Sequence, residues 1–176
     1  QGPEIHALEA ALSEYVDVEH CIGVSSGTDA LLIALMALDI GPGDEVITQA
    51  FNFIATVEAI LDCGAIPVIA NVDLSLNMDV DDLQSLISEK TKAILPVHML
   101  GVAANLEAIL KIATESSISV VEDSCESIGS TYNGQYLGTL GKAGAISFDQ
   151  GKMVVTGEGG MVLTNEATVS TSGPTS

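Results

Sequence analysis

The chain has 176 residues, of which 47% are hydrophobic, and a formal net charge of −19 at pH 7. This length and apolar fraction predict one folded domain and argue against intrinsic disorder. Five basic residues, all of them lysines, stand against 24 acidic ones, which disfavours binding to nucleic-acid phosphates or anionic membranes, so we expect neither partner.

The apolar segments and the cysteines favour a cytoplasmic protein. The longest apolar run, residues 30–38, is far shorter than the roughly 20 residues needed to cross a bilayer. No basic stretch followed by an apolar one begins at Gln1, as a secretory signal would require. Cys21, Cys63 and Cys125 are odd in number and lie in apolar segments, so we expect buried free thiols. The three histidines are too far apart in the sequence to indicate a metal site.

The predicted elements alternate along the chain. Pro3 suits a first helical turn, and apolar residues recur at helical spacing from Ile5 to Tyr15. Apolar runs then predict seven strands, at 21–24, 45–48, 66–69, 93–97, 118–122, 145–148 and 161–164. Helical patterns separate the first five, at 29–38, 55–61, 80–87 and 106–115, and turn signals lie at 41–44 and 133–134. This alternation predicts an α/β fold with a mostly parallel sheet and helices on both faces.

Polar residues follow three of these strands, where ligands bind in such sheets. The segment 25–29, Ser-Ser-Gly-Thr-Asp, opens an apolar helix. Glycine and free N–H groups there could bind an anion, although on the segment alone simple helix capping is the favoured interpretation. Asp123 follows the fifth strand and could hold a cation or a protonated ring nitrogen, or be only a surface acid.

Lys152 lies in a glycine-containing stretch after the sixth strand. A lysine desolvated in such surroundings loses proton affinity and can form a Schiff base with a carbonyl compound. On composition alone, a solvated loop lysine is the simpler interpretation.

Several segments occur together in one order. They are Gln1-Gly-Pro-Glu, Ser25-Ser-Gly-Thr-Asp-Ala-Leu, Gly41-Pro-Gly-Asp-Glu-Val-Ile, Phe51-Asn-Phe-Ile-Ala-Thr, Pro96-Val-His, Glu122-Asp, Gly138-Thr-Leu-Gly, Ser147-Phe, and Lys152 followed by Gly157-Glu-Gly-Gly-Met-Val. This series resembles the DegT/DnrJ/EryC1/StrS sugar aminotransferases, which use pyridoxal 5′-phosphate on the fold-type I scaffold. The resemblance implies a three-layer sandwich with a seven-stranded sheet whose last strand is antiparallel.

The resemblance also implies roles for individual residues. Lys152 matches the lysine that forms the Schiff base with the cofactor, and Asp123 matches the carboxylate that pairs with its pyridinium nitrogen, so these two are the expected catalytic residues. Gly27, Thr28 and Ser147 match the groups that bind the cofactor phosphate.

Two further residues match cofactor contacts, with one departure. Phe53 matches the aromatic ring that stacks on the pyridine ring. Glu126 stands where many relatives have Gln or His near the phenolic oxygen, and an acid at this position also occurs in relatives similar to perosamine-type synthases. We expect His98, at a strand end, to be a structural residue.

By the same resemblance, residues 1–166 form a pyridoxal-phosphate-binding large domain. Relatives begin before Gln1 and continue past Thr164 into a small domain, so we expect a large-domain fragment that forms a homodimer or associates further. The last residues, 167–176, are small and polar, and we expect a disordered tail there.

The implied function is transfer of an amino group, with glutamate as donor, to a keto group of a nucleotide-linked sugar. A first alternative is a catalytically inactive fragment that self-associates. A second is a sugar dehydratase on the same scaffold, but those relatives replace the lysine by His, and Lys152 argues against it.

Overall fold

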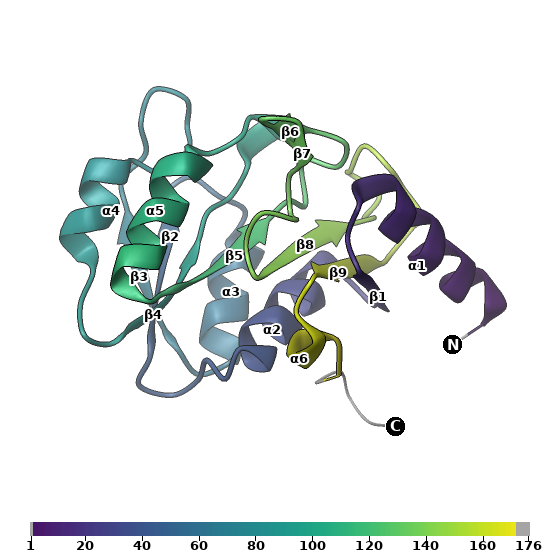
Figure 1. Ribbon diagram of the computed structural model, residues 1–176, viewed down its shortest axis with the longest axis horizontal. Helices are drawn as coiled ribbons and strands as arrows, with labels where there is room; N and C mark the ends of the chain where they lie inside the picture. Colours follow the sequence, from purple (N-terminus) through teal and green to yellow (C-terminus); the bar gives the residue numbers. More distant parts are fainter. Residues whose placement is uncertain (1, 172–176) are drawn as a thin grey trace.

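Seven strands form one sheet at the centre of the computed structural model, which describes residues 2–171. Their order across the sheet is β1-β9-β8-β5-β4-β2-β3 (Figure 1). The strands are β1 His20–Val24, β2 Glu45–Gln49, β3 Ile66–Ala70, β4 Thr91–Leu95, β5 Ser119–Asp123, β8 Ala143–Ser147 and β9 Gly160–Thr164. Only β9 runs antiparallel to its neighbours, β1 and β8. The mostly parallel α/β fold predicted from the sequence is therefore confirmed.

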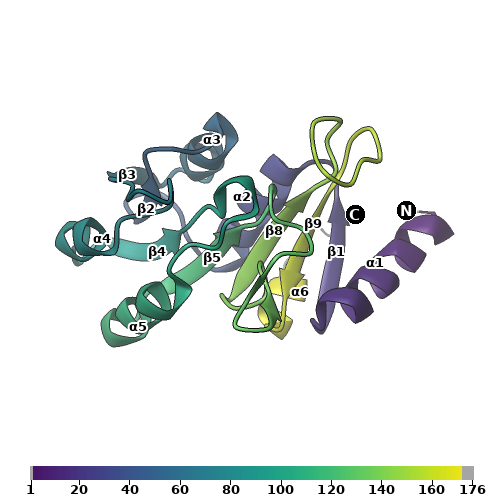
Figure 2. The same ribbon diagram turned by 90° about the horizontal axis from the view of Figure 1, so that it is seen from above.

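Helices cover both faces of the sheet, which gives three layers (Figure 2). The helices are α1 Pro3–Val16, α2 Gly27–Ala37, α3 Ile54–Asp62, α4 Val80–Leu86, α5 Leu106–Ser116 and α6 Ala167–Thr171, with a 3-10 turn η1 at Met99–Gly101. Buried residues of α2, α3 and α6 share one hydrophobic cluster, which also contains Val121 of β5. Residues of α4 and α5 pack with Val120 in a second cluster. Because side chains alternate along a strand, these two clusters lie on opposite faces of the sheet.

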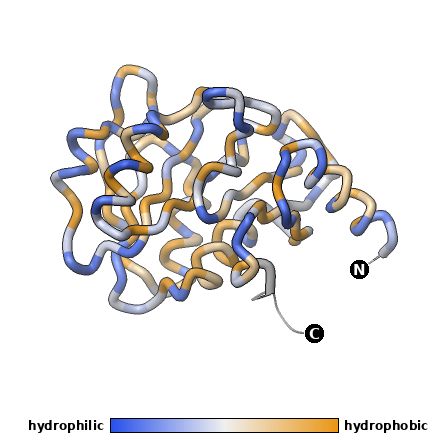
Figure 3. Tube along the Cα trace, in the orientation of Figure 1, coloured by the Kyte–Doolittle hydropathy of each residue, from blue (hydrophilic) through white to orange (hydrophobic). Residues whose placement is uncertain are grey.

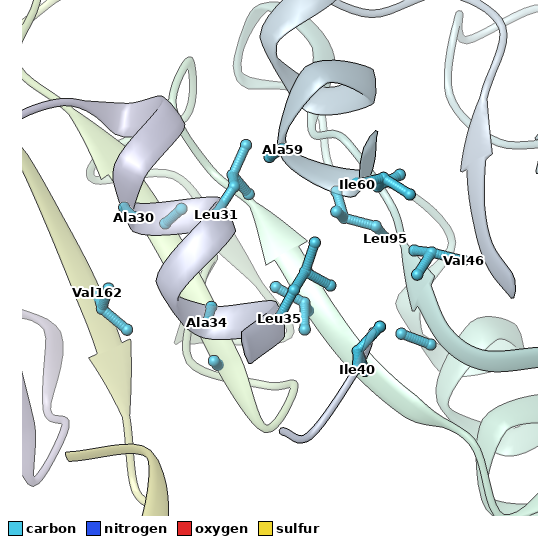
Figure 4. Close-up of a cluster of buried hydrophobic side chains, with 14 of the residues drawn as sticks. Ala30, Leu31, Ala34, Leu35, Ile40, Val46, Ala59, Ile60, Leu95 and Val162 are labelled. Atoms are coloured by element: carbon cyan, nitrogen blue, oxygen red, sulfur yellow. The ribbon is translucent and has the colours of Figure 1, made fainter. Parts of the chain in front are cut away.

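Helix α2 is the centre of the first cluster. Ala30, Leu31, Ala34 and Leu35 are almost fully buried, at the spacing that places them on one side of a helix. In Figure 4 these side chains face β9 on one side, and Ile60 and strands β2 and β4 on the other. Figure 3 shows the same concentration of hydrophobic residues in α2 and the strands, with hydrophilic residues along the outer turns.

The observed elements begin and end within a few residues of those predicted. Strand β4 ends earlier than expected, because Pro96 has no N–H group to extend the ladder. The turn signal at Asn133 and Gly134 closes a small hairpin, formed by β6 Thr131–Tyr132 and β7 Gln135–Tyr136. Both turn residues have positive φ, 51° and 85°, as a tight hairpin turn requires.

The expectation of a disordered tail is wrong for residues 167–171. They form α6, and Val169 is buried in the cluster around α2. The buried Val169 side chain and a bond from the Val169 N–H to the Glu166 carbonyl help to hold this turn in place. Residues 172–176 lie outside the described part of the chain. Within residues 2–171, no helix is both long and apolar enough to cross a membrane.

Candidate active site

A cavity of about 360 Å³ lies where β5 and β8 end and α2 begins. All seven residues that the sequence singled out for the site line this cavity: Gly27, Thr28, Phe53, Asp123, Glu126, Ser147 and Lys152. They come from four separate parts of the chain, and the parallel strands bring them together because their carboxyl ends meet at one edge of the sheet.

Asp123 forms the floor of the cavity at the end of β5. Its side chain points to the α2 side of the sheet, and the residue is only 5% exposed. One carboxylate oxygen, Oδ2, accepts a hydrogen bond of 2.8 Å from the Thr56 hydroxyl, and Oδ1 accepts one of 3.1 Å from the Cys125 N–H. Both neighbours are donors, which suits an ionised carboxylate with lone pairs left for a further cationic donor.

The Lys152 amine reaches into the same cavity. Its Nζ lies 3.5 Å from Oε1 of Glu126 and 5.7 Å from the centre of the Phe53 ring, and its side chain is 19% exposed. A hydrogen bond from the Lys152 N–H to the Asp149 carbonyl fixes the turn that carries it. Lys152 is therefore mostly shielded from solvent, unlike the solvated loop lysine that composition alone suggested. Among the described residues that line the cavity, Lys152 is the single lysine, beside four carboxylates.

The start of α2 offers hydrogen-bond donors but no positively charged side chain. Ser26 caps the helix by accepting the Asp29 N–H at 3.0 Å. Gly27 follows, and a Cβ built there would lie 2.7 Å from Cβ of Ser147 and 2.9 Å from Sγ of Cys125. The missing side chain thus lets the helix start approach β8 closely. The first-turn N–H groups of a helix lack intrahelical acceptors, and together with the hydroxyls of Thr28 and Ser147 they can hold an anion. Capping and anion binding are compatible here.

Two residues shape the mouth of the cavity. Phe53 sits just before α3 with 66% of its surface exposed, although it is aromatic and lines the cavity. An exposed ring at this place can stack on a planar ligand. Glu126 pairs with Lys152 and also accepts the Leu100 N–H at 3.3 Å through Oε2.

The Cys125 thiol also lines the cavity. Burial raises the pKa of Cys125 well above its ordinary value, and the negative charge of Asp123 raises it further. The thiol therefore stays protonated and a poor nucleophile. Among residues 2–171, no group of three or more His, Cys, Asp or Glu residues is arranged to hold a metal ion.

His98 lies on the other side of the sheet end, away from the cavity. Its Nε2 is 2.9 Å from Oε2 of the fully buried Glu122, and its Nδ1 accepts the Ala104 N–H at 3.2 Å. Since Nδ1 accepts, the proton is on Nε2, which donates to Glu122. This arrangement is consistent with a structural histidine.

Sequence reasoning missed the contribution of Thr56. It belongs to the segment 51–56 that carried the family resemblance, but no role was assigned to it. Phe53 immediately precedes α3, Thr56 lies in the first turn of this helix, and both line the cavity. The bond to Asp123 joins residues from α3 and β5, and no local pattern in the sequence predicts that contact.

Comparison with known proteins identifies relatives along nearly the whole chain. The DegT/DnrJ/EryC1/StrS aminotransferase family matches residues 1–172. GDP-perosamine synthase of Caulobacter vibrioides is 42% identical over 166 residues, which cover 94% of this chain and 45% of that protein. The chain thus spans about half the length of this curated relative.

Two solved structures have the same fold. An aminotransferase from Psychrobacter cryohalolentis superposes with a TM-score of 0.95 at 37% identity, covering 97% of this chain and 44% of the other. NtdA from Bacillus subtilis, solved with the bound cofactor PMP, superposes with a TM-score of 0.92 at 34% identity, covering 98% and 39%. From the matched span and the shared fold we conclude that the chain belongs to the DegT/DnrJ/EryC1/StrS aminotransferase family.

Proposed function

We propose that this chain is the cofactor-binding domain of an aminotransferase that uses pyridoxal 5′-phosphate to place an amino group on a keto carbon of a nucleotide-linked sugar. The observation that carries the proposal is the convergence of the Lys152 amine, the buried Asp123 carboxylate and the start of α2 on one cavity. Its relatives support the chemistry: one is a GDP-perosamine synthase, and a structural neighbour contains PMP.

The residues present fit this cofactor. The close approach of Gly27 to Ser147 brings the first-turn N–H groups of α2 and the hydroxyls of Thr28 and Ser147 together, and these neutral donors suit a phosphate group at the helix start. Asp123, with two donors already on its oxygens, suits a protonated pyridine nitrogen. Phe53 at the mouth suits stacking on the ring. When bound, pyridoxal phosphate supplies an aldehyde that combines with amines and a ring that withdraws electrons from the adjacent carbon.

Three side chains of the cavity would then have separate roles in the reaction. Lys152 Nζ would hold the cofactor and, once displaced by the amino donor, would move a proton from the donor carbon to the cofactor in the first half of the reaction and from the cofactor to the acceptor carbon in the second. Glu126, 3.5 Å from Nζ, stabilises the ammonium that forms when Lys152 holds this proton. Asp123 would keep the ring nitrogen protonated, and a protonated ring withdraws electrons more strongly.

We infer further that glutamate is the amino donor, that the protein is cytoplasmic and that the working form is a homodimer. The surroundings of the cavity support the dimer: Phe53 lines it, Leu100 donates its N–H to the lining residue Glu126, Met153 follows Lys152 in the chain, and all three are more than half exposed. Apolar surface of this kind beside a site favours cover by another chain.

Amino transfer can be measured in two halves. The chain is loaded with pyridoxal phosphate and given glutamate, and pyridoxamine phosphate and 2-oxoglutarate are measured by chromatography. A nucleotide-linked 3-keto or 4-keto sugar is then added, and the amino sugar product is measured. We expect Lys152→Ala to lower both rates by about 100-fold or more, because it removes the group that moves the proton.

Lys111→Ala is the matched control, since Lys111 lies on α5 with a side chain that is 73% exposed, and it should leave both rates unchanged. Formation of a deoxy sugar in place of an amine would show a dehydratase. A loaded chain that converts neither glutamate nor any keto sugar would contradict the proposal and favour an inactive fragment.

A further inference from the structure

Thr56 carries a buried hydroxyl whose partner is the carboxylate of Asp123. We propose that Thr56 is a positioning residue that fixes the orientation of Asp123 toward the ring nitrogen of the cofactor. This role rests on the function proposed above, and it concerns a contact within this chain that can also be tested without any cofactor.

The contact is short and shielded from water. Thr56 is fully buried near the start of α3, and its Oγ1 donates to Asp123 Oδ2 at 2.8 Å. The Thr56 N–H is occupied by the Phe53 carbonyl at 3.0 Å. With solvent excluded, the hydroxyl donates its hydrogen bond to the carboxylate. A hydrogen bond to a charged acceptor is stronger than one to a neutral acceptor.

The two oxygens of Asp123 are held by different elements. The Cys125 N–H, from the turn after β5, occupies Oδ1, and the Thr56 hydroxyl from α3 occupies Oδ2. Rotation about the last side-chain bond of an aspartate is otherwise broad. Together the two donors therefore select one orientation of the carboxylate plane. Only the Thr56 donor can be removed by a substitution, because the other belongs to the backbone.

Thr56 thus acts on the ring nitrogen through Asp123 without touching it. Without the hydroxyl, Oδ2 would lack a donor and the carboxylate could turn away from the position that meets the ring nitrogen. The bond between Asp123 and that nitrogen would weaken, whereas the contacts of the cofactor phosphate at Gly27 and Ser147 would stay as they are.

The test compares two ligands, pyridoxal phosphate and its analogue with carbon in place of the ring nitrogen. Thr56→Val removes the hydroxyl at nearly constant shape, and Thr56→Ser keeps it. We expect the unaltered chain and Thr56→Ser to bind pyridoxal phosphate more tightly than the analogue. In Thr56→Val the ratio of the two affinities should fall by about 10-fold. A purely structural role would weaken both ligands equally and leave the ratio unchanged, which would overturn the proposal.

A second measurement separates this proposal from the proposed function. The carbon-13 signal of the Asp123 carboxyl is recorded in the cofactor-free chain, with thermal unfolding as a check that each variant is folded. We expect the signal to move in Thr56→Val and to stay in place in Thr56→Ser. If the unaltered chain binds neither ligand, the proposed function fails, and this signal alone then decides whether Thr56 holds Asp123. An Asp123 signal that is the same in all three chains would overturn the positioning role.

Discussion

Glu122 and Asp123 are adjacent acids with different surroundings. Alternation along β5 turns Asp123 toward the cavity, while Glu122 points to the opposite side of the sheet, where its side chain is fully buried. Oε1 of Glu122 accepts the N–H groups of Leu140 and Gly141, and Oε2 accepts the Gly138 N–H and His98. One acid is thus available for a ligand, and its neighbour is fully engaged in the fold.

Cys21 makes stability depend on pH at the alkaline end. Burial raises the pKa of Cys21 from 9.0 to about 12, and the charge of Glu9 adds to the shift. In the unfolded chain the thiol titrates near its ordinary value. Between these two values the unfolded chain releases a proton that the folded chain keeps, so the free energy of unfolding falls as the pH rises.

We expect Cys21→Ser to reduce this loss. Urea unfolding at about pH 8 and about pH 10 should show that the variant loses roughly 1 kcal/mol less free energy of unfolding over this interval than the unaltered chain. The comparison within each chain cancels any constant cost of the substitution. The same loss in both chains would mean that the Cys21 thiol titrates normally in the folded state.

At the scale of elements, Glu122 and His98 connect parts of the chain that surround the site. Glu122, at the end of β5, accepts hydrogen bonds from the turn at 138–141. His98 bonds to Glu122 and also accepts the N–H of Ala104, which follows η1 in the chain. Four donors converge on one carboxylate whose side chain is fully buried. Such a cluster is stabilising only while every donor has an acceptor.

Glu122→Gln should therefore destabilise the chain strongly. The amide oxygen can accept two of the four hydrogen bonds, and the NH₂ group must then face two donors, because Nδ1 of His98 is already occupied. We expect the free energy of unfolding to fall by roughly 2–4 kcal/mol, measured by urea unfolding. Glu115→Gln on α5, where the glutamate side chain is 61% exposed, should change it by less than about 0.5 kcal/mol. Equal effects of the two substitutions would contradict the role of Glu122.

The sequence predicted the larger elements because their patterns are local. Alternating apolar runs and helical periodicity identified the seven strands and α1 to α5, and the rule for parallel sheets predicted that the polar strand ends would meet. The strands of the β6–β7 hairpin have only two residues each, too few for a periodic signal. Among residues 167–169 of α6, whose burial is described, Val169 alone is buried, and the contact of Thr56 with Asp123 depends on tertiary packing. These features could not be predicted from local pattern.

At the scale of the whole molecule, the strand order assembles the site. Strand β8 lies between β5 and β9, and α2 packs against both β8 and β9. The end of β5, the end of β8 and the start of α2 therefore meet, although they are distant in the sequence. The chain carries a net charge of −19. Among the described residues that line the cavity, Lys152 is the one cationic side chain. An anion bound here would therefore be held by backbone N–H groups and hydroxyls.

The most direct test of this account is the place where pyridoxal phosphate becomes attached. The chain is incubated with the cofactor and reduced with borohydride, and the modified peptides are identified by mass spectrometry. We expect attachment at Lys152 in the unaltered chain and in Lys111→Ala, and loss of this attachment in Lys152→Ala. Attachment spread evenly over the other lysines, or a folded chain with Lys152 unmodified, would contradict it.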